Sequence, residues 1–223
     1  DQVSSRGLGD VYKRQESFSK NVVDNFTQMY AQGLTPNPCV ECNRSVKFDH
    51  FINQAKKLNC DKVATGHYAK IIKNNGKYEL HKADYLDKDQ SYVLHMLKSS
   101  DLENITFPLG EISKPEVRQI AARIGLRTAF KKDSQDICFV GKKDYRSFVE
   151  KRIDLTSPGE IFDTKGNKVG DHNGIHEFTV GQRKGLPGGY GTPRYVTKIN
   201  VQNKNVTIGE KNDLLVSSFI IEE

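Results

Sequence analysis

The sequence changes its hydrophobic pattern near Pro158, and this change limits the fold more than any other feature. Up to residue 153, apolar residues recur at the spacing of amphipathic helices, and one short apolar segment, 62–65, ends at a glycine turn. A helix, a short strand and a glycine turn in succession are typical of an α/β unit. Beyond Pro158, short strand-like segments alternate with turn residues, which is typical of a small barrel or sandwich. We therefore expect two regions with a boundary at residues 153–158.

Four segments of the first region are predicted to be helices. Two of them, residues 22–30 and 48–58, carry apolar stripes at helical spacing. The third begins at Ser113, a favourable N-cap residue, and ends at Gly125, and the fourth covers residues 144–153. The apolar face predicted for the third helix consists of Val117, Ile120, Ala121 and Ile124.

The second region is predicted to consist of short strands. A turn is expected at Gly166-Asn167, and apolar and polar residues alternate along the third of the strands. The predicted strands are residues 160–163, 176–180, 195–201 and 206–208.

The charge balance and the hydropathy exclude some classes of protein. Lys and Arg number 34 and Asp and Glu 28, which gives a net charge of +6, a balance that suits an anionic partner or simple solubility. No stretch approaches the 18 or so consecutive apolar residues of a membrane span, and the first residues lack the apolar core of a signal peptide. We therefore expect a cytoplasmic protein with reduced thiols and no membrane contact.

Cys39 and Cys42 form a C-x-x-C motif within a proline-rich segment, residues 35–43 (TPNPCVECN). The two prolines predict an ordered loop rather than a helix. A C-x-x-C pair can hold a metal or a disulfide, but a structural zinc site needs a second pair, which the sequence lacks; two packed thiols are the alternative. Cys138, between an isoleucine and a phenylalanine, and Cys60, at a helix end, read by themselves as structural residues.

Three further motifs suit ligand contacts but also have simpler interpretations. Gly66-His67 follows a short strand, where ligands bind in open α/β sheets, although His67 can equally be a turn residue. Residues 88–90 (Lys-Asp-Gln) suit polar contacts or a solvated loop. Residues 181–185 (GQRKG) form a basic, glycine-flanked turn that suits a phosphate, although basic turns are common on β domains.

Seven strings of the sequence, taken in their order along the chain, strongly resemble the tRNA-specific 2-thiouridylase family. This family installs sulfur at C2 of the wobble uridine of tRNA. The resemblance runs from about residue 16 to about residue 218. The strings are TPNPCVECNRSVKF, ATGHYAK, KDQSYVL, FPLGEISKPEVRQIA, KKDSQDICFVG, PGEIFD and FTVGQRKGL.

The resemblance implies an α/β nucleotide α-hydrolase-like (ATP pyrophosphatase) domain that lacks its N-terminal part, followed by a small, mainly β central domain. Residues 1–15 match nothing in the family and are expected to be foreign or disordered. Residues 16–153 correspond to the C-terminal portion of the pyrophosphatase domain and 154–210 to the central domain. Residues 211–223 correspond to the start of a truncated β-barrel.

The resemblance also implies the reaction. ATP, with Mg²⁺, adenylates the C2 oxygen of uridine 34, and sulfur then arrives from a cysteine persulfide. The expected partners are tRNAs with Lys-, Glu- or Gln-type anticodon loops and a sulfur-relay protein or cysteine desulfurase, with the enzyme a monomer. The resemblance implies that Cys42 is the nucleophile and Cys138 the persulfide carrier, with a Cys42–Cys138 disulfide closing the cycle. It implies that the target base is contacted by Asn37, Pro38 and Cys39. It further implies that ATP is contacted by Gly66, and tRNA by His67, Lys88, Asp89 and Gln90.

The sequence departs from the family in two ways. Cys39 stands where many members carry an acidic residue that is assigned as the general acid. With a cysteine at this position, the alternative hypothesis is that Cys39, Cys42 and Cys138 are three ligands of a [4Fe–4S] cluster. The Ser-Gly-Gly-x-Asp-Ser pyrophosphatase loop of the family does not occur in the chain. We therefore expect the 223 residues alone to be inactive, and a non-catalytic RNA-binding fragment remains the rival interpretation. The synthetases that make 4-thiouridine or 2-thiocytidine are disfavoured by the GQRKGL and SKPEVR strings.

Overall fold

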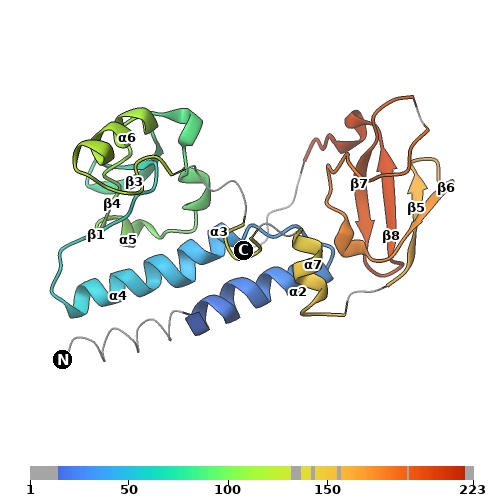
Figure 1. The fold of residues 1–223 in the computed structure, drawn as a ribbon, viewed down its shortest axis with the longest axis horizontal. Helices are drawn as coiled ribbons and strands as arrows, with labels where there is room; N and C mark the ends of the chain where they lie inside the picture. Colours follow the sequence, from blue (N-terminus) through green and yellow to red (C-terminus); the bar gives the residue numbers. More distant parts are fainter. Residues whose placement is uncertain (1–14, 132–136, 142–143, 155–156, 190, 219–223) are drawn as a thin grey trace. The chain divides into compact units, whose positions relative to one another are not determined.

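A computed structural model describes residues 15–131, 137–141, 144–154, 157–189 and 191–218. The described residues form two compact units, the first from residues 15–23 and 37–138 and the second from 24–36 and 139–218 (Figure 1). No helix among the described residues is long and apolar enough to cross a membrane. The predicted domain boundary at residues 153–158 stays a prediction, and so does the predicted change from the central domain to the truncated barrel between residues 210 and 211. Residues 1–14 lie outside the part of the chain that the structure describes.

The first unit contains an uninterrupted helical run that begins at Pro38. It consists of α3 (Pro38–Glu41), the π-helix η2 (Cys42–Phe48) and α4 (Asp49–Lys57). The prediction of a loop over 35–43 is therefore wrong in its second half. Pro38 occupies the first helical turn, where its missing N–H costs nothing, so the proline begins the helix instead of preventing it.

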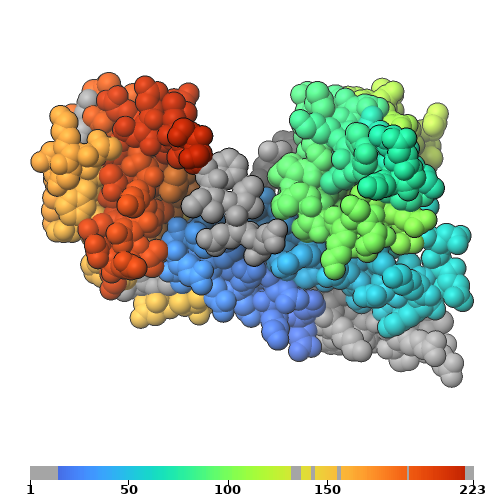
Figure 2. All heavy atoms as spheres, turned by 180° about the vertical axis from the view of Figure 1, so that it is seen from behind, coloured from blue at the N-terminus to red at the C-terminus, as the bar shows by residue number. Residues whose placement is uncertain are grey.

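Short strands pack beside this run. Strand β1 (Val63–Ala64), as predicted, pairs in parallel with β4 (Ile105–Thr106). An antiparallel hairpin of β2 (Ala69–Asn74) and β3 (Lys77–Lys82) was not predicted, although its Asn75-Gly76 turn, at φ 48° and 79°, is a hairpin signal. The buried core of the unit comprises Phe48, Ile52, Ala69, Val93, Leu94, Ile105 and Phe107. Figure 2 shows the part of the first unit that follows α4 as one continuous body, coloured teal to yellow-green.

The remaining elements of the first unit are short, apart from α6. They are η3 (Leu86–Lys88), η4 (Ser91–Val93) and α5 (Ser99–Leu102). The predicted helix α6 (Lys114–Arg123) is confirmed, with a capping box between Ser113 and Glu116. Its predicted apolar face is not buried by the described residues, since Ile120 is 38% and Ile124 62% exposed.

The second unit begins with the predicted first helix, whose π-helical turn η1 (Ser19–Asp24) straddles the two units and continues into α2 (Asn25–Ala31). Phe26 contacts Phe139 and Phe148, and the latter lies on α7 (Tyr145–Glu150). These aromatic contacts hold α2 against α7 within the unit.

A four-stranded sheet with the order β6-β5-β8-β7 forms the rest of the second unit. Its strands are β5 (Gly159–Asp163), β6 (Lys168–His172), β7 (Tyr195–Asn200) and β8 (Asn205–Gly209). The predicted strand at 176–180 is wrong, because residues Ile175–Glu177 form the 3-10 turn η5, and β6 was missed. A last 3-10 turn, η6 (Lys211–Leu214), follows the sheet.

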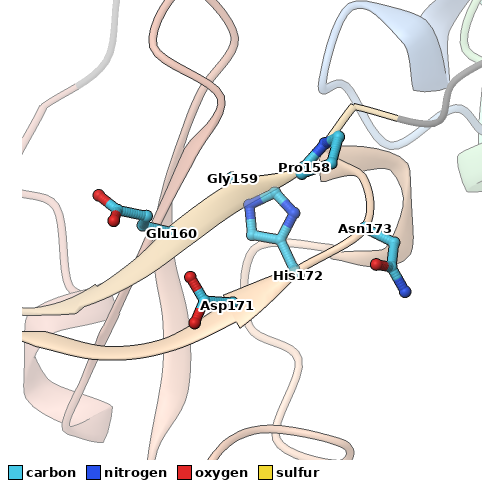
Figure 3. Close-up of a pocket in the computed structure, with 6 residues that line it drawn as sticks. All are labelled: Pro158, Gly159, Glu160, Asp171, His172 and Asn173. Carbon is cyan, nitrogen blue, oxygen red and sulfur yellow. The ribbon is translucent and has the colours of Figure 1, made fainter.

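Strand β5 passes very close to its neighbours at Gly159 (Figure 3). A Cβ atom there would lie 1.9 Å from the Lys204 carbonyl oxygen and 2.8 Å from the His172 ring. The His172 Nε2 and the same carbonyl oxygen are 2.9 Å apart, and burial lowers the pKa of this histidine. Only glycine fits at this position of the strand.

Candidate active site

Cys39 and Cys42 lie at the start of the helical run of the first unit. Asn37 caps the run, since its Oδ1 accepts a hydrogen bond from the Cys39 N–H at 3.2 Å, and Pro38 is buried behind it. Cys39 is exposed and Cys42 half-buried, and their i, i+3 spacing places them on one face of the helix. The unpaired N–H groups of the first helical turn give this end of the helix a partial positive charge.

Cys138 belongs to the same unit and interacts electrostatically with Cys42. Burial raises the pKa of Cys42, and the negative charges that Cys138, Cys39 and Glu41 can carry raise it further. The structure thus brings together the three cysteines singled out from the sequence. All four cysteines of the chain are free thiols. Cys138 and Cys60 are both exposed, so Cys138 is not the core residue that its apolar neighbours suggest.

Lys47 is a residue of the site that the sequence did not reveal. Its positive charge lowers the pKa of Cys42 and so acts against burial and the neighbouring negative groups, which raise this pKa. In the π-helix η2, hydrogen bonds join residues five apart, and this register brings position 47 above position 42. In an α-helix the same two positions would diverge, so only recognition of the π-helix would have pointed to Lys47.

Asn43, next to Cys42, fixes the helix to the core. Its side chain is 2% exposed, and its Nδ2 donates to the Val93 carbonyl oxygen at 3.0 Å. Glu41 forms an ion pair at 2.5 Å with Arg44, three residues further along the same helical run. The hydrogen bond of Asn43 therefore anchors the thiol-bearing turn to the core of the unit.

Residues 88–90 lie close to the segment after β1. The Gln90 N–H donates to the Tyr68 carbonyl oxygen at 2.8 Å, and its side-chain Oε1 accepts from the Tyr68 N–H at 3.1 Å. The structure thus joins two motifs that are distant in the sequence. Asp89 accepts from the Ala83 N–H at 2.8 Å and from the Ser91 hydroxyl at 2.7 Å. Both carboxylate oxygens of Asp89 therefore stabilise the conformation of this loop. The role of Lys88, Asp89 and Gln90 in tRNA contact stays a prediction.

Replacing Asp89 with alanine is expected to destabilise the first unit by about 2 kcal/mol, because two charge-assisted hydrogen bonds are lost. Urea unfolding followed by circular dichroism measures the change. The matched control is Asp87→Ala, an exposed aspartate of the same loop, which we expect to change stability by less than about 0.5 kcal/mol. Equal losses in both variants would show that Asp89 does not organise the loop.

His67 lies in the core of the first unit and not on its surface. It is 8% exposed, and its ring centroid lies 5.8 Å from that of Phe48 and 5.9 Å from that of Phe107. Its Nδ1 and the Thr65 hydroxyl are 2.8 Å apart. Burial, assisted by the positive charge of Lys47, lowers its pKa to about 4, so the ring is neutral at pH 7. The tRNA contact implied for His67 and the ATP contact implied for Gly66 stay predictions.

The buried His67 makes stability depend on pH. Between pH 6.5 and about 4 the unfolded chain binds a proton that the folded chain does not, so the folded state loses stability as the pH falls through this range. The full loss is on the order of 3 kcal/mol. Urea unfolding from pH 7.5 to pH 4 should show a shallower dependence for His67→Gln than for the unchanged chain. His95→Gln, at an exposed histidine, should retain the original dependence.

Comparison with known proteins agrees with the resemblance seen in the sequence. Residues 9–142 match the family model described as the tRNA methyl transferase HUP domain, and residues 146–210 match the tRNA methyl transferase PRC-barrel domain. These matches confirm the predicted fold class, a nucleotide α-hydrolase-like domain followed by a small β domain.

Three relatives illustrate the similarity, and all are named tRNA-specific 2-thiouridylase MnmA. The relative from Leptospira biflexa is 45% identical over 213 residues, 96% of this chain and 56% of that protein. The relative from Chloroflexus aurantiacus is 47% identical over 89% of this chain and 56% of that protein. The relative from Rickettsia prowazekii is 44% identical over 94% of this chain and 59% of that protein.

The chain thus spans somewhat more than half the length of the curated relatives that it matches. Its match to the HUP-domain model covers more than half of its own residues, and the thiouridylase relatives align along nearly all of it. The chain therefore belongs to the tRNA methyl transferase HUP-domain family, in which its relatives are the tRNA-specific 2-thiouridylases.

Proposed function

We propose that the chain is part of a sulfurtransferase that thiolates C2 of uridine 34 in tRNA. The observation that carries this proposal is the group of three free thiols, Cys39, Cys42 and Cys138, within one unit of a protein whose relatives are named 2-thiouridylases. The family model is described by methyl transfer, but thiols at a helix start are the chemical groups that sulfur transfer requires.

The first step of the proposed reaction activates the base. The C2 oxygen of uridine is a poor leaving group, so it attacks the α-phosphate of ATP and becomes an adenylate, with pyrophosphate released. A bound Mg²⁺ would offset the charge of the triphosphate. Gly66, at the carboxyl end of β1, is the residue of this chain that we assign to ATP contact, because the nearest atom to a Cβ there is Leu109 Cδ1 at 3.6 Å and the backbone is open to a ligand.

The second step transfers sulfur. The terminal sulfur of a persulfide on Cys138 attacks C2, and AMP leaves with the former C2 oxygen. The Cys42 thiolate then attacks the Cys138 sulfur, which breaks the S–S bond, leaves the outer sulfur on C2 and forms a Cys42–Cys138 disulfide. A cellular thiol reduces this disulfide for the next cycle. Lys47 supports the Cys42 thiolate, since its charge offsets part of the cost of burying that thiolate.

A [4Fe–4S] cluster is the alternative carrier of the sulfur. Three thiols suit three irons of such a cluster, and the fourth iron would remain free to bind sulfide. Three of the four free cysteines of the first unit, Cys39, Cys42 and Cys138, fit this donor set, and Cys39 would hold one iron beside Cys42. Anaerobic reconstitution of a hybrid in which this chain replaces the matched region of a full-length relative separates the two mechanisms: full activity without absorbance near about 400 nm would exclude the cluster.

We propose tRNAs with Lys-, Glu- or Gln-type anticodons as the substrates. The proposed sulfur donor is a sulfur-relay protein or a cysteine desulfurase. The enzyme is proposed to be a monomer in the cytoplasm. The uridine must leave its stack to reach the thiols, so contacts to the RNA backbone are required. The exposed position of Cys138 supports access by a protein donor.

A graft tests the proposed function. The matched region of the Leptospira biflexa relative is replaced by this chain, so that the rest of the relative supplies the segments that this chain does not cover. The hybrid is expressed in a bacterium that lacks its own 2-thiouridylase, and nucleosides from digested tRNA are analysed by mass spectrometry. We expect 2-thiouridine derivatives at position 34. A folded, tRNA-binding hybrid that forms none would favour the non-catalytic RNA-binding interpretation.

A further inference from the structure

The basic turn of the second unit, Thr179–Gly185, has a fixed conformation. The side chain of Gln182 spans it: Oε1 accepts from the Thr179 N–H and Nε2 donates to the Lys184 carbonyl oxygen, each at 3.0 Å. The backbone of the turn is joined to β7, because the Gly181 N–H donates to the Val196 carbonyl oxygen at 2.8 Å. The Val196 N–H donates in return to the Gln182 carbonyl oxygen at 2.9 Å.

Core residues fix both ends of the turn. Phe178, just before it, is 5% exposed, and Leu186, just after it, packs against the same buried cluster of the β unit. Gly181 and Gly185 adopt φ values of 88° and 75°, which other residues rarely tolerate. The turn is therefore organised before any ligand binds, which lowers the entropic cost of binding.

The charged side chains of the turn face solvent without compensation. Arg183 and Lys184 are exposed, and neither forms an ion pair with any other residue in the part of the chain that the structure describes. A Cβ built at Gly181 or Gly185 would meet no atom within 4 Å, so the backbone beside the two cations is open. An anion can thus approach both the side chains and the backbone.

The surrounding sequence extends this positive character. Residues 178–209 contain no Asp or Glu and five basic residues, whereas the whole chain contains 28 acidic residues. Besides Arg183 and Lys184, the basic residues are Arg194, Lys198 and Lys204. Of these, Lys198 and Lys204 are exposed, while Arg194 is 3.6 Å from a Glu210 oxygen. Spaced cations on an exposed surface suit a polyanion better than a small metabolite, which needs a concave pocket.

We propose that the turn Thr179–Gly185 binds backbone phosphates of RNA through Arg183 and Lys184, with Gln182 as the positioning residue that holds the turn in shape. The inference rests on the proposed function in one respect, the identification of the RNA as tRNA. Phosphate contacts position a protein on its nucleic acid without reading its sequence, so the turn would orient the tRNA and the thiols would act on the base.

The test is binding of an unmodified tRNA transcript to the purified chain, followed by fluorescence anisotropy at several salt concentrations. For the double variant Arg183→Gln/Lys184→Gln, we expect about tenfold weaker binding and a salt dependence reduced by about one to two units of slope, one for each lost phosphate contact. Gln182→Ala should weaken binding with little change of slope, because both cations remain. Arg183→Lys should retain most of the affinity.

The matched control is Lys56→Gln/Lys57→Gln, which removes two adjacent exposed lysines of α4 and should leave both affinity and slope nearly unchanged. Unchanged binding by the Arg183/Lys184 variant, or no RNA binding by the chain, would overturn the inference. The grafted enzyme separates this failure from that of the proposed function. A hybrid that thiolates tRNA while the turn variant binds normally refutes only the inference, and a hybrid that binds through the turn without thiolating refutes only the function.

Discussion

Formation of 2-thiouridine is expected to fall by a factor of at least about 1,000 when Cys42 is replaced by serine in the grafted enzyme, because loss of an activated nucleophile removes the covalent step. A serine hydroxyl at this position is not ionised near neutral pH and cannot attack a persulfide sulfur. Cys138→Ser should cause an equal loss, since no sulfur can then be carried. The measurement is the yield of 2-thiouridine at position 34 per enzyme.

Cys60→Ser provides the matched control, because Cys60 is also an exposed free thiol of the first unit and no step of the mechanism uses it. Its activity should remain within about twofold of the unchanged hybrid, as is usual for surface substitutions. Activity retained by Cys42→Ser would contradict the assignment of the nucleophile. Cys39→Ser then separates the mechanisms: the persulfide cycle survives this change, whereas a cluster held by three cysteines loses a ligand.

The sequence predicted the elements that depend on local signals. The capping box at Ser113 and Glu116 and the apolar stripe ending at Tyr30 are both confirmed as helices. The helix at Pro38 was missed because proline was read as an interruption, although proline at the first helical position is favourable when Asn37 supplies the cap. The cap supplied by Asn37 therefore decides whether Pro38 begins a helix or interrupts one.

The candidate site was predicted less completely than the fold. The three cysteines of the site were identified through the family resemblance, while the residues by themselves favoured structural roles for Cys138 and Cys60. The contribution of Lys47 depends on the π-helical register, which no propensity scale predicts. The burial of His67 depends on Phe107, forty residues away, and long-range packing of this kind is not encoded in a local pattern.

Phe48 connects the stability of the first unit with its candidate site, and its truncation should have the largest effect on folding. The side chain is 1% exposed, and its ring contacts His67 and Phe107 at centroid distances of 5.8 and 6.1 Å. It is also the last residue of η2, the π-helix that begins at Cys42. Phe48→Ala is expected to cost about 3–5 kcal/mol, because it removes buried apolar surface and leaves a cavity.

Phe130→Ala is the matched control, since the same truncation at a side chain that is 83% exposed should change stability by less than about 0.5 kcal/mol. Urea unfolding of both variants measures the difference, and the first unit should unfold before the second in Phe48→Ala. Because the lost ring also covers His67, the same variant should expose the imidazole to water and weaken the dependence of stability on pH between 6.5 and about 4. A variant that is destabilised but keeps the full pH dependence would show that Phe48 supports the core without shielding His67.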